Sequence, residues 1–302
     1  MRNFNSITIT IFVSFLACLM ATSALARNPV EQTLTASADG KVKIKVIDGD
    51  VVVKTWNKAE VSVFGELDKD ANQFIFESRG DEILIEVKGD HDWRKHSWES
   101  NSVDLIITVP SASSVEATSS SAEFVIEGVQ GDVHAHSASG DITLVDVSGA
   151  ISLQSMSGDL RVMKSSGKLN LSSVSGDIDV EGNAQHLDVT TVSGDVDAKL
   201  ARVELMDFTS VSGDLEVQFE LADKGRIDAN TVSGDMRFDF ANKKINARFD
   251  IETGPGGDIE NQLSDARAES SFIGAEKLKF ELGSGRATIE LRTMSGTIDL
   301  RN

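Results

Sequence analysis

Hydrophobic and polar residues alternate in short runs along most of the chain, and Ile178-Asp179-Val180 is a representative run. In each run the apolar side chains occupy the second and fourth positions after a glycine or an equivalent residue. Such alternation predicts a β-strand with one buried face and one face in water. A helix would need apolar residues three and four positions apart, and these runs lack that spacing. The other apolar pairs are Ile142/Leu144, Ile151/Leu153, Leu160/Val162, Leu169/Leu171, Leu187/Val189, Val196/Ala198, Leu215/Val217 and Met236/Phe238.

The turns between these strands repeat the sequence Ser-Gly-Asp, and the spacing of the repeat predicts how the strands are arranged. The first three intervals between its glycines are equal and the last two are slightly longer, and Gly131, Gly149 and Gly167 lie half an interval before the first three of these glycines. A fixed short period is typical of solenoids, in which each unit buries its apolar face against its neighbours. The sequence therefore predicts an all-β fold, a single parallel β-solenoid (β-helix) with coils of about 18 residues and two short strands per coil. The residues of this structural turn repeat are Gly140/Asp141, Gly158/Asp159, Gly176/Asp177, Gly194/Asp195, Gly213/Asp214 and Gly234/Asp235.

The residue types of the turn have distinct expected roles. Glycine should allow a sharp change of direction through a positive φ, which a Cβ would hinder. Serine and aspartate side chains can hydrogen-bond backbone groups that the turn leaves unpaired. Because aspartate occurs only at alternate turns, the carboxylates should form a ladder along one edge, about 4.8 Å apart. Unit charges at that spacing repel by about 1 kcal/mol in water, so the ladder should face water, accept backbone bonds or share a cation.

The first residues of the chain have the features of a secretory signal peptide. Residues 1–26 contain Arg2, then an apolar stretch, then the small-residue site Ala24-Leu25-Ala26. We expect cleavage near Ala26 rather than lipidation at Cys18, because the residues before Cys18 fit a lipidation site poorly. The sequence therefore predicts an extracytoplasmic protein of the periplasm or the cell surface.

The remainder, 27–302, should form one β-solenoid domain, because its strands follow the same pattern throughout. The pattern is irregular at 27–110, which we expect to form N-terminal coils and a cap. Regular repeats occupy 111–240. The pattern loosens again at 241–302, where we expect C-terminal coils and a cap, and within it residues 264–275 fit either a short helix or a loop.

The chain is strongly acidic, with 48 Asp and Glu against 29 Lys and Arg and a net charge of −19. Removal of Arg2 with the signal peptide changes this to −19 − 1 = −20. An acidic chain without a basic patch is not expected to bind nucleic acid. The predicted mature chain has no cysteine, so neither a disulfide nor a thiol nucleophile is expected. No transmembrane segment is expected after signal removal, because no later apolar run is long enough.

The repeated phrase Val174-Ser175-Gly176-Asp177-Ile178 resembles a bacterial domain family of unknown function labelled putative adhesin. The resemblance extends from about Gly40 to Asn302. It includes the segments Asp50–Trp56, Leu105–Pro110 and Ala287–Gly296. The resemblance implies a β-helix fold. It implies no catalytic residue, because the family offers no catalytic motif to carry over.

A polar, tryptophan-rich segment at 90–102 interrupts the strand pattern and is the candidate interaction loop. It contains His91, Trp93, His96 and Trp98. Aromatic side chains beside charged ones on a loop can form a platform for a sugar or a protein. The alternative is a loop whose tryptophans fold back onto the solenoid.

The metal-binding interpretations are weaker than the structural ones. Calcium-binding β-rolls use Gly-Gly-x-Gly-x-Asp at every half-coil, whereas here a single glycine precedes aspartate at alternate turns only. Aspartate as a turn residue is therefore the preferred interpretation, with calcium binding as the alternative. His134 and His136 share one face of a strand, but only Asp132 is near enough to add a ligand, and zinc sites need three or four. We expect no cofactor.

No catalytic motif is apparent in the sequence. Asp179, Asp188 and Asp197 face outward and could supply paired carboxylates for polysaccharide cleavage, but acidic residues occur over the whole chain. The sequence therefore predicts a non-catalytic, adhesin-like scaffold that binds a protein or a glycan of the cell envelope. The alternative is a carbohydrate-binding or carbohydrate-active β-helix protein.

Overall fold

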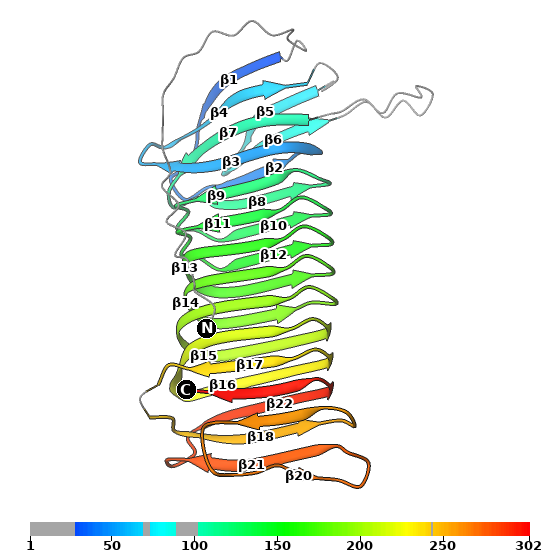
Figure 1. Cartoon of the computed structure of the whole chain (residues 1–302). Helices are drawn as coiled ribbons and strands as arrows, with labels where there is room; N and C mark the ends of the chain where they lie inside the picture. Colours follow the sequence, from blue (N-terminus) through cyan, green and yellow to red (C-terminus); the bar gives the residue numbers. More distant parts are fainter. Residues whose placement is uncertain (1–27, 69–72, 89–101, 243) are drawn as a thin grey trace, which may run out of the picture.

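The computed structural model describes residues 28–68, 73–88, 102–242 and 244–302. Outside these ranges lie the predicted signal peptide and four residues of the candidate interaction loop, His91, Trp93, His96 and Trp98. The described backbone forms a 23-stranded, mostly parallel β-sheet without helices, as the alternation predicts. The strands are stacked as the rungs of a solenoid-like body (Figure 1). None of the described segments is a helix that could cross a membrane.

In the regular region each strand pairs in parallel with the equivalent strand of the next coil. Ile142 is the register partner of Leu160, Leu160 of Ile178, and Ile178 of Val196. The offset between these partners equals the regular interval of the turn repeat, and it becomes longer in the two coils that follow. The strands are β8 (Ser114–Ser119), β9 (Glu123–Glu127), β10 (Val133–Ser137), β11 (Ile142–Val145), β12 (Ile151–Ser155), β13 (Leu160–Ser173), β14 (Ile178–Thr190), β15 (Val196–Ser212), β16 (Leu215–Ser233) and β17 (Met236–Phe240).

Each coil places strand segments on two faces of the stack. Leu160 at the start of β13 pairs with β11 on one face, and Leu169 later in β13 pairs with β12 on the other. The faces are joined by a smooth bend at one edge and by the Ser-Gly-Asp turn at the other. These sharp turns, which follow β10 and β12, lie along the right-hand edge in Figure 1. The repeat therefore brings equivalent turn residues to one edge of the molecule.

The N-terminal strands are stacked out of chain order and include antiparallel pairs. β2 lies between β6 and β8, and β3 lies between β7 and β9, all in parallel. β4 runs antiparallel to β1 and β7, and β5 to β6. Parallel pairing in this cap is limited to the pairs that β2 and β3 make, and strands joined by a tight turn, such as β5 and β6, pair antiparallel. The strands are β1 (Asn28–Thr35), β2 (Lys41–Lys45), β3 (Asp48–Trp56), β4 (Glu60–Leu67), β5 (Gln73–Arg79), β6 (Glu82–Lys88) and β7 (Ser102–Pro110).

The C-terminal strands are inserted between earlier ones. β22 lies between β16 and β18, and β23 lies between β17 and β19. β21 runs antiparallel to β18 and to the short β20. Residues 264–275 are a loop that contains β20 and no helix, which resolves the two possibilities left open by the sequence. The strands are β18 (Ala247–Thr253), β19 (Asp258–Asn261), β20 (Glu269–Ser270), β21 (Glu276–Leu282), β22 (Ala287–Ser295) and β23 (Thr297–Arg301).

The core is a series of aliphatic ladders that ends in an aromatic cluster. Ile142, Leu160 and Ile178 have no solvent exposure, and each side chain of this size contributes about 1.5–3 kcal/mol when buried. Near the C-terminal end Phe240 lies between Phe219 and Phe249, with ring centroids 5.2 Å and 5.9 Å away. Phe249 stacks on a further ring with an interplanar angle of 2°. These larger side chains fill the longer coils at this end of the stack.

Candidate interaction edge

The aspartates of the turn repeat are bonded to the backbone of the neighbouring coil. Oδ1 of Asp177 accepts the backbone N–H of Asp195 at 3.0 Å, and the N–H of Asp177 donates to Oδ1 of Asp159 at 3.0 Å. The same bond joins every consecutive pair from Asp141 to Asp235, at 2.8 to 3.0 Å. The last carboxylate accepts the N–H of Thr297 at 2.7 Å. Of the three arrangements expected for a carboxylate ladder, the backbone-bonded one is therefore present.

Two hydroxyl series complete the turns. The hydroxyl of Ser175 donates to the carbonyl oxygen of Met156 in the preceding coil, at 3.1 Å. The buried Oγ of Ser173 accepts the N–H of Gly176 at 2.9 Å, within the same turn. Equivalent bonds occur at Ser139, Ser157 and Ser193 in the first series, and at Ser137, Ser155 and Thr191 in the second. The first series therefore joins adjacent coils, and the second closes each turn.

Glycine is required in these turns by the close approach of two backbones. Gly176 does not have a positive φ, so the sequence-based reason for its presence is wrong. A Cβ on Gly176 would lie 2.1 Å from the carbonyl oxygen of Gly158 in the preceding coil. Equivalent distances at Gly140, Gly158 and Gly194 are 2.0 to 2.3 Å. Among the turn-repeat glycines, positive φ is found at Gly213 and Gly234, at 159° and 152°, and it also occurs at the half-coil position Gly167, at 108°.

From the turn at Gly158 onward, a valine or methionine precedes the Ser-Gly pair of each of these turns, and its side chain remains partly in water. We call this set the corner stripe. Backbone bonds join its rungs, for example from the N–H of Ser193 to the carbonyl oxygen of Val174 and from that of Ser212 to Val192. The side chains keep between 43% and 58% of their surface exposed. The corner stripe consists of Met156, Val174, Val192, Val211, Val232 and Met294.

The aspartate ladder belongs to a longer line of carboxylates, which we call the acidic column. Glu123 lies beside Asp141, because its neighbour Phe124 is the register partner of Ile142. The column continues through Asp50, Asp104 and Glu66, which are register partners in turn. Sequence analysis missed these members. The signal that could have found Asp50, Asp104 and Glu123 is an acidic residue directly before an apolar-x-apolar triplet, as in Asp50-Val51-Val52-Val53, whereas Glu66 does not precede such a triplet.

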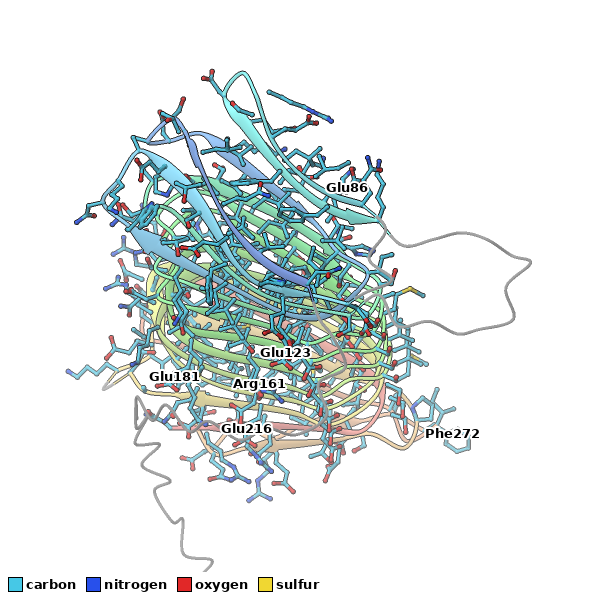
Figure 2. All side chains as sticks on the ribbon, turned by 90° about the horizontal axis from the view of Figure 1, so that it is seen from above. Glu86, Glu123, Arg161, Glu181, Glu216 and Phe272 are labelled. Carbon is cyan, nitrogen blue, oxygen red and sulfur yellow. The ribbon has the colours of Figure 1, made fainter. Side chains whose placement is uncertain are left out.

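Arg161 is the cation that contacts the upper part of the aspartate ladder. Its guanidinium lies 2.9 Å from a carboxylate oxygen of Asp159, 3.7 Å from one of Asp141 and 3.4 Å from one of Asp179. Figure 2, seen along the stack, shows Arg161 on the same outer face as Glu123 and Glu216. The remaining ladder residues, Asp177, Asp195, Asp214 and Asp235, form no ion pair with any described residue. These four carboxylates lack an ion pair with the described residues, although Arg237 and Arg301 line the same depression as Asp214 and Asp235.

The other sequence-predicted residues are only partly brought together. Asp179 and Asp197 are register partners on one face, whereas Asp188 lies on the other face beside Asp207. His134 and His136 are exposed on β10. Oδ1 of Asp132 accepts the N–H of Ala150 at 2.9 Å. Across the described ranges, no three His, Cys, Asp or Glu side chains are arranged to hold a metal ion.

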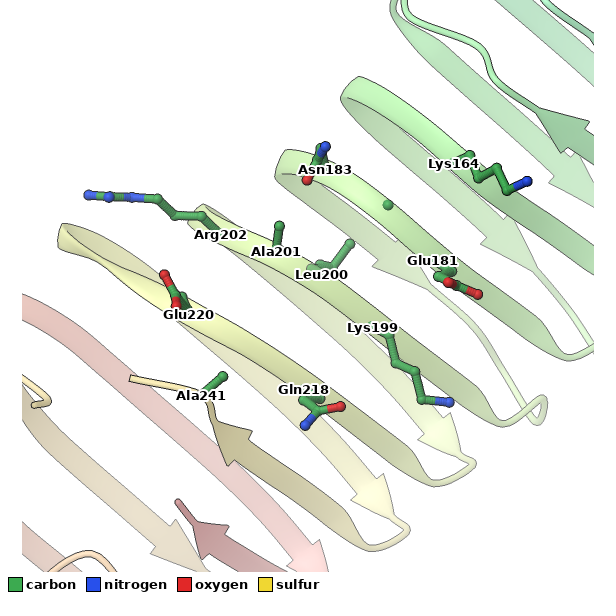
Figure 3. A pocket seen from close by; sticks show the side chains of 11 residues that line it. Lys164, Glu181, Asn183, Lys199, Leu200, Ala201, Arg202, Gln218, Glu220 and Ala241 are labelled. Carbon is green, nitrogen blue, oxygen red and sulfur yellow. The ribbon is translucent and has the colours of Figure 1, made fainter. Parts of the chain in front are cut away.

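A shallow groove of about 720 Å³ lies at the smooth bend, on the edge opposite the corner stripe. It forms where the register between β14 and β15 shifts after Gly182, because β15 has an additional residue there. Figure 3 shows that its charged side chains come from successive coils and point outward. They are of both signs, with Lys164, Lys199 and Arg202 beside Glu181 and Glu220.

The best-defined charge cluster lies away from both edges, at Glu116 on β8. Lys41 and Lys43 on β2 approach its carboxylate oxygens to 2.5 Å and 2.6 Å. Their hydrogen bonds lower the pKa of Glu116 from its usual 4.5 to about 2, against the opposing effect of burial. The cluster joins the first coil of the chain, β2 and β3, to the regular region.

Comparison with known proteins identifies a family. The family model described as Toastrack DUF4097 matches residues 40–250. That range is well over half of the chain. None of the curated proteins matches.

Three solved structures are similar over most of their length. A putative adhesin from Bacteroides fragilis is 14% identical, with 91% of this chain and 98% of that chain covered and a TM-score of 0.42. A putative lipid binding protein from Parabacteroides distasonis is 13% identical, with coverage of 91% and 97% and a TM-score of 0.40. A putative cell adhesion protein from Clostridium sporogenes is 9% identical, with coverage of 91% and 99% and a TM-score of 0.27.

Proposed function

The chain belongs to the Toastrack DUF4097 family, and we propose that it acts as a non-catalytic, adhesin-like scaffold outside the cytoplasm. In this proposal the mature chain is one continuous β-helix with coils of about 18 residues. Its outer faces bind a protein or a glycan of the cell envelope. The expected signal peptide at 1–26 supports an extracytoplasmic location.

The observation that carries the proposal is the use of the turn residues. The most regular polar groups of the chain, from Asp141 to Asp235, are engaged in bonds between coils. These bonds fix the spacing of the stack. Such a stack is a rigid support that displays side chains at a constant interval of about 4.8 Å.

The experiment measures binding and turnover together. Fluorescently labelled protein is incubated with envelope fragments from the organism that encodes it, and bound protein is measured as a function of its concentration. Reducing sugar released into the supernatant is measured in the same samples. We expect saturable binding without release of sugar.

The control is Ile178→Asp, which places a charge at a position with no solvent exposure and should disrupt the stack. Loss of binding in this variant would tie binding to the folded solenoid. Release of sugar by the wild type would favour a carbohydrate-active protein instead. Recovery of the native protein from the cytoplasmic fraction of the cell would contradict the proposed location.

A further inference from the structure

We propose that the corner stripe, together with Asp177, Asp195, Asp214 and Asp235 of the aspartate ladder, binds an extended protein segment rich in aliphatic and basic residues. This inference rests on the proposed function, since it names the surface and the chemistry of the partner. It starts from the exposed valines and methionines, because a turn in water is normally built from small polar residues.

The corner stripe exposes more apolar surface than the fold requires. Successive rungs are about 4.8 Å apart, so the valines of adjacent coils can shield one another in part. Val192 and Val211 nevertheless keep 43% and 50% of their surface in water. Single exposed apolar residues are ordinary, but an uninterrupted line of them marks a contact surface. Threonine would have the same shape and would keep the strand preference without this exposure.

The shape of the stripe fits a linear occupant. It is one side chain wide and five steps of about 4.8 Å long, or roughly 24 Å. A globular partner would need a broader patch, since specific protein interfaces bury about 800 Å² on each side. An extended segment of a partner protein can follow a line of this width and place alternate side chains along it.

Charge complementarity defines the chemistry of the segment. Asp177, Asp195, Asp214 and Asp235 follow the stripe residues by three positions in each turn. They use Oδ1 for the backbone of the next coil, and no described cation pairs with them. A segment with lysine or arginine beside an aliphatic residue would pair with these carboxylates and pack against the corner stripe at once. A second copy of this chain would bring its own carboxylates to the edge, which disfavours self-association there.

The experiment uses three synthetic dodecapeptides with alternating Lys/Leu, Glu/Leu and Lys/Ser. Their binding to the full-length protein is measured by fluorescence anisotropy. We expect the Lys/Leu peptide to bind at least about tenfold more tightly than either of the others, because only it has both complementary features.

Matched pairs of variants locate the binding site. Val192→Thr/Val211→Thr should weaken binding of the Lys/Leu peptide by about tenfold. Phe64→Thr/Ile106→Thr removes two similarly exposed apolar side chains on β4 and β7, outside the stripe, and should have no effect on peptide binding.

A second pair tests the charge. Asp195→Asn/Asp214→Asn keeps the oxygen that accepts the backbone bond and removes the charge, so it should weaken peptide binding similarly. Asp188→Asn/Asp207→Asn on the opposite face is its control.

Several outcomes would overturn the inference. One is equal binding of the Lys/Ser and Lys/Leu peptides. Another is an equal loss of affinity for the Lys/Leu peptide in a test variant and its control. A dimer in sedimentation experiments that Val192→Thr/Val211→Thr dissociates would make a second copy the occupant.

If the valine and aspartate test variants leave binding to envelope fragments unchanged, only this inference fails. If the wild type does not bind the fragments at all, the proposed function fails. Thermal unfolding of every variant verifies that it is folded.

Discussion

At the scale of single residues, the distance between backbones determines where glycine is needed. At Gly176 a Cβ would come within 2.1 Å of the carbonyl oxygen of Gly158 and 2.6 Å of its carbon. Both atoms belong to the backbone of the adjacent coil, so they cannot move aside as a flexible side chain could. Any other residue must therefore separate the two coils locally.

We expect Gly176→Ala to lower the free energy of unfolding by about 3 kcal/mol, as inserted atoms do in packed interiors. Ser175→Ala in the same turn removes one exposed hydrogen bond and should cost less than about 1 kcal/mol. Urea denaturation of both variants measures the difference. Equal stability of the two would contradict the close approach of the coils.

The aspartate ladder makes a separate prediction, because asparagine retains the oxygen that accepts the backbone bond. Asp177→Ala leaves the N–H of Asp195 without its partner, at a cost of about 1–2 kcal/mol. Asp177→Asn keeps the bond and removes repulsion with the adjacent carboxylates, so its stability should equal or exceed that of the wild type. Thermal unfolding at neutral pH ranks the two variants. A less stable Asn variant would mean that the charge itself is needed.

The ion pairs of Glu116 predict a dependence on acid pH. Because the pKa of Glu116 is lowered from 4.5 to about 2 in the folded protein, the contribution of its ion pairs to the free energy of unfolding is complete above pH 4.5. It decreases as pH falls from about 4.5 to about 2, where the folded protein also takes up the proton. Glu116→Gln should therefore be less stable than the wild type at pH 6, and the difference should shrink as pH approaches 2. Melting temperatures over this pH range test the prediction, and a constant difference would refute it.

Sequence reasoning was effective for the kind of bond that a turn residue makes, and less so for its partner. That Ser175 and Asp177 bond backbone groups could be predicted from their residue types, but the partners lie in neighbouring coils. The reason for Gly176 could not, because the clash is with the backbone of the preceding coil. The corner stripe was overlooked because Val192 and its equivalents lie outside the alternation that defines the strands.

At the scale of strands, regular alternation predicts pairing only where the stack follows chain order. β11, β13 and β14 are consecutive rungs of one face, and their register follows directly from the period. The positions of β22 and β23 could not be predicted in this way. Each ladder position accepts any aliphatic side chain, so periodicity does not reveal that β22 is inserted between β16 and β18.

Deletion of residues 287–302 should be far more damaging than deletion of residues 28–35. The first removes β22 and β23, which are paired on both sides and carry Ile289, Leu291, Ile298 and Leu300, all without exposure. Each such side chain contributes about 1.5–3 kcal/mol, and whole domains are stable by only about 5–15 kcal/mol. We expect loss of cooperative unfolding and rapid proteolysis of the shortened chain.

The deletion of β1 is the control, because β1 pairs only with β4 among the described strands and has a single buried apolar side chain, Val30. It should lower the melting temperature only modestly. Circular dichroism and limited proteolysis compare the two shortened proteins. Similar decreases in melting temperature and in resistance to proteolysis would indicate that strands inserted in the stack are no more important for stability than strands at its edge.

At the scale of the whole molecule, the acidic column concentrates negative charge along one edge of a chain whose net charge is −19. Raising the ionic strength from about 0.01 M to about 0.15 M shortens the Debye length from about 30 Å to about 8 Å. We expect the melting temperature to rise by about 2–4 °C, which corresponds to about 1 kcal/mol for a chain of this size. The increase should be smaller in Asp177→Asn/Asp195→Asn. An unchanged melting temperature would show that the carboxylates do not destabilise the stack.

The insertion of β22 between β16 and β18 has a consequence for the order of events during synthesis. A chain made from its N-terminus completes Ala247–Thr253 well before Ala287–Ser295. The free edge of β16 therefore meets β18 first, and both β18 and β22 offer alternating apolar residues at the spacing this edge accepts. Premature docking of β18 would close the gap that β22 must enter. The native order is reached only if this early pairing is avoided or is reversed once the later strand has emerged.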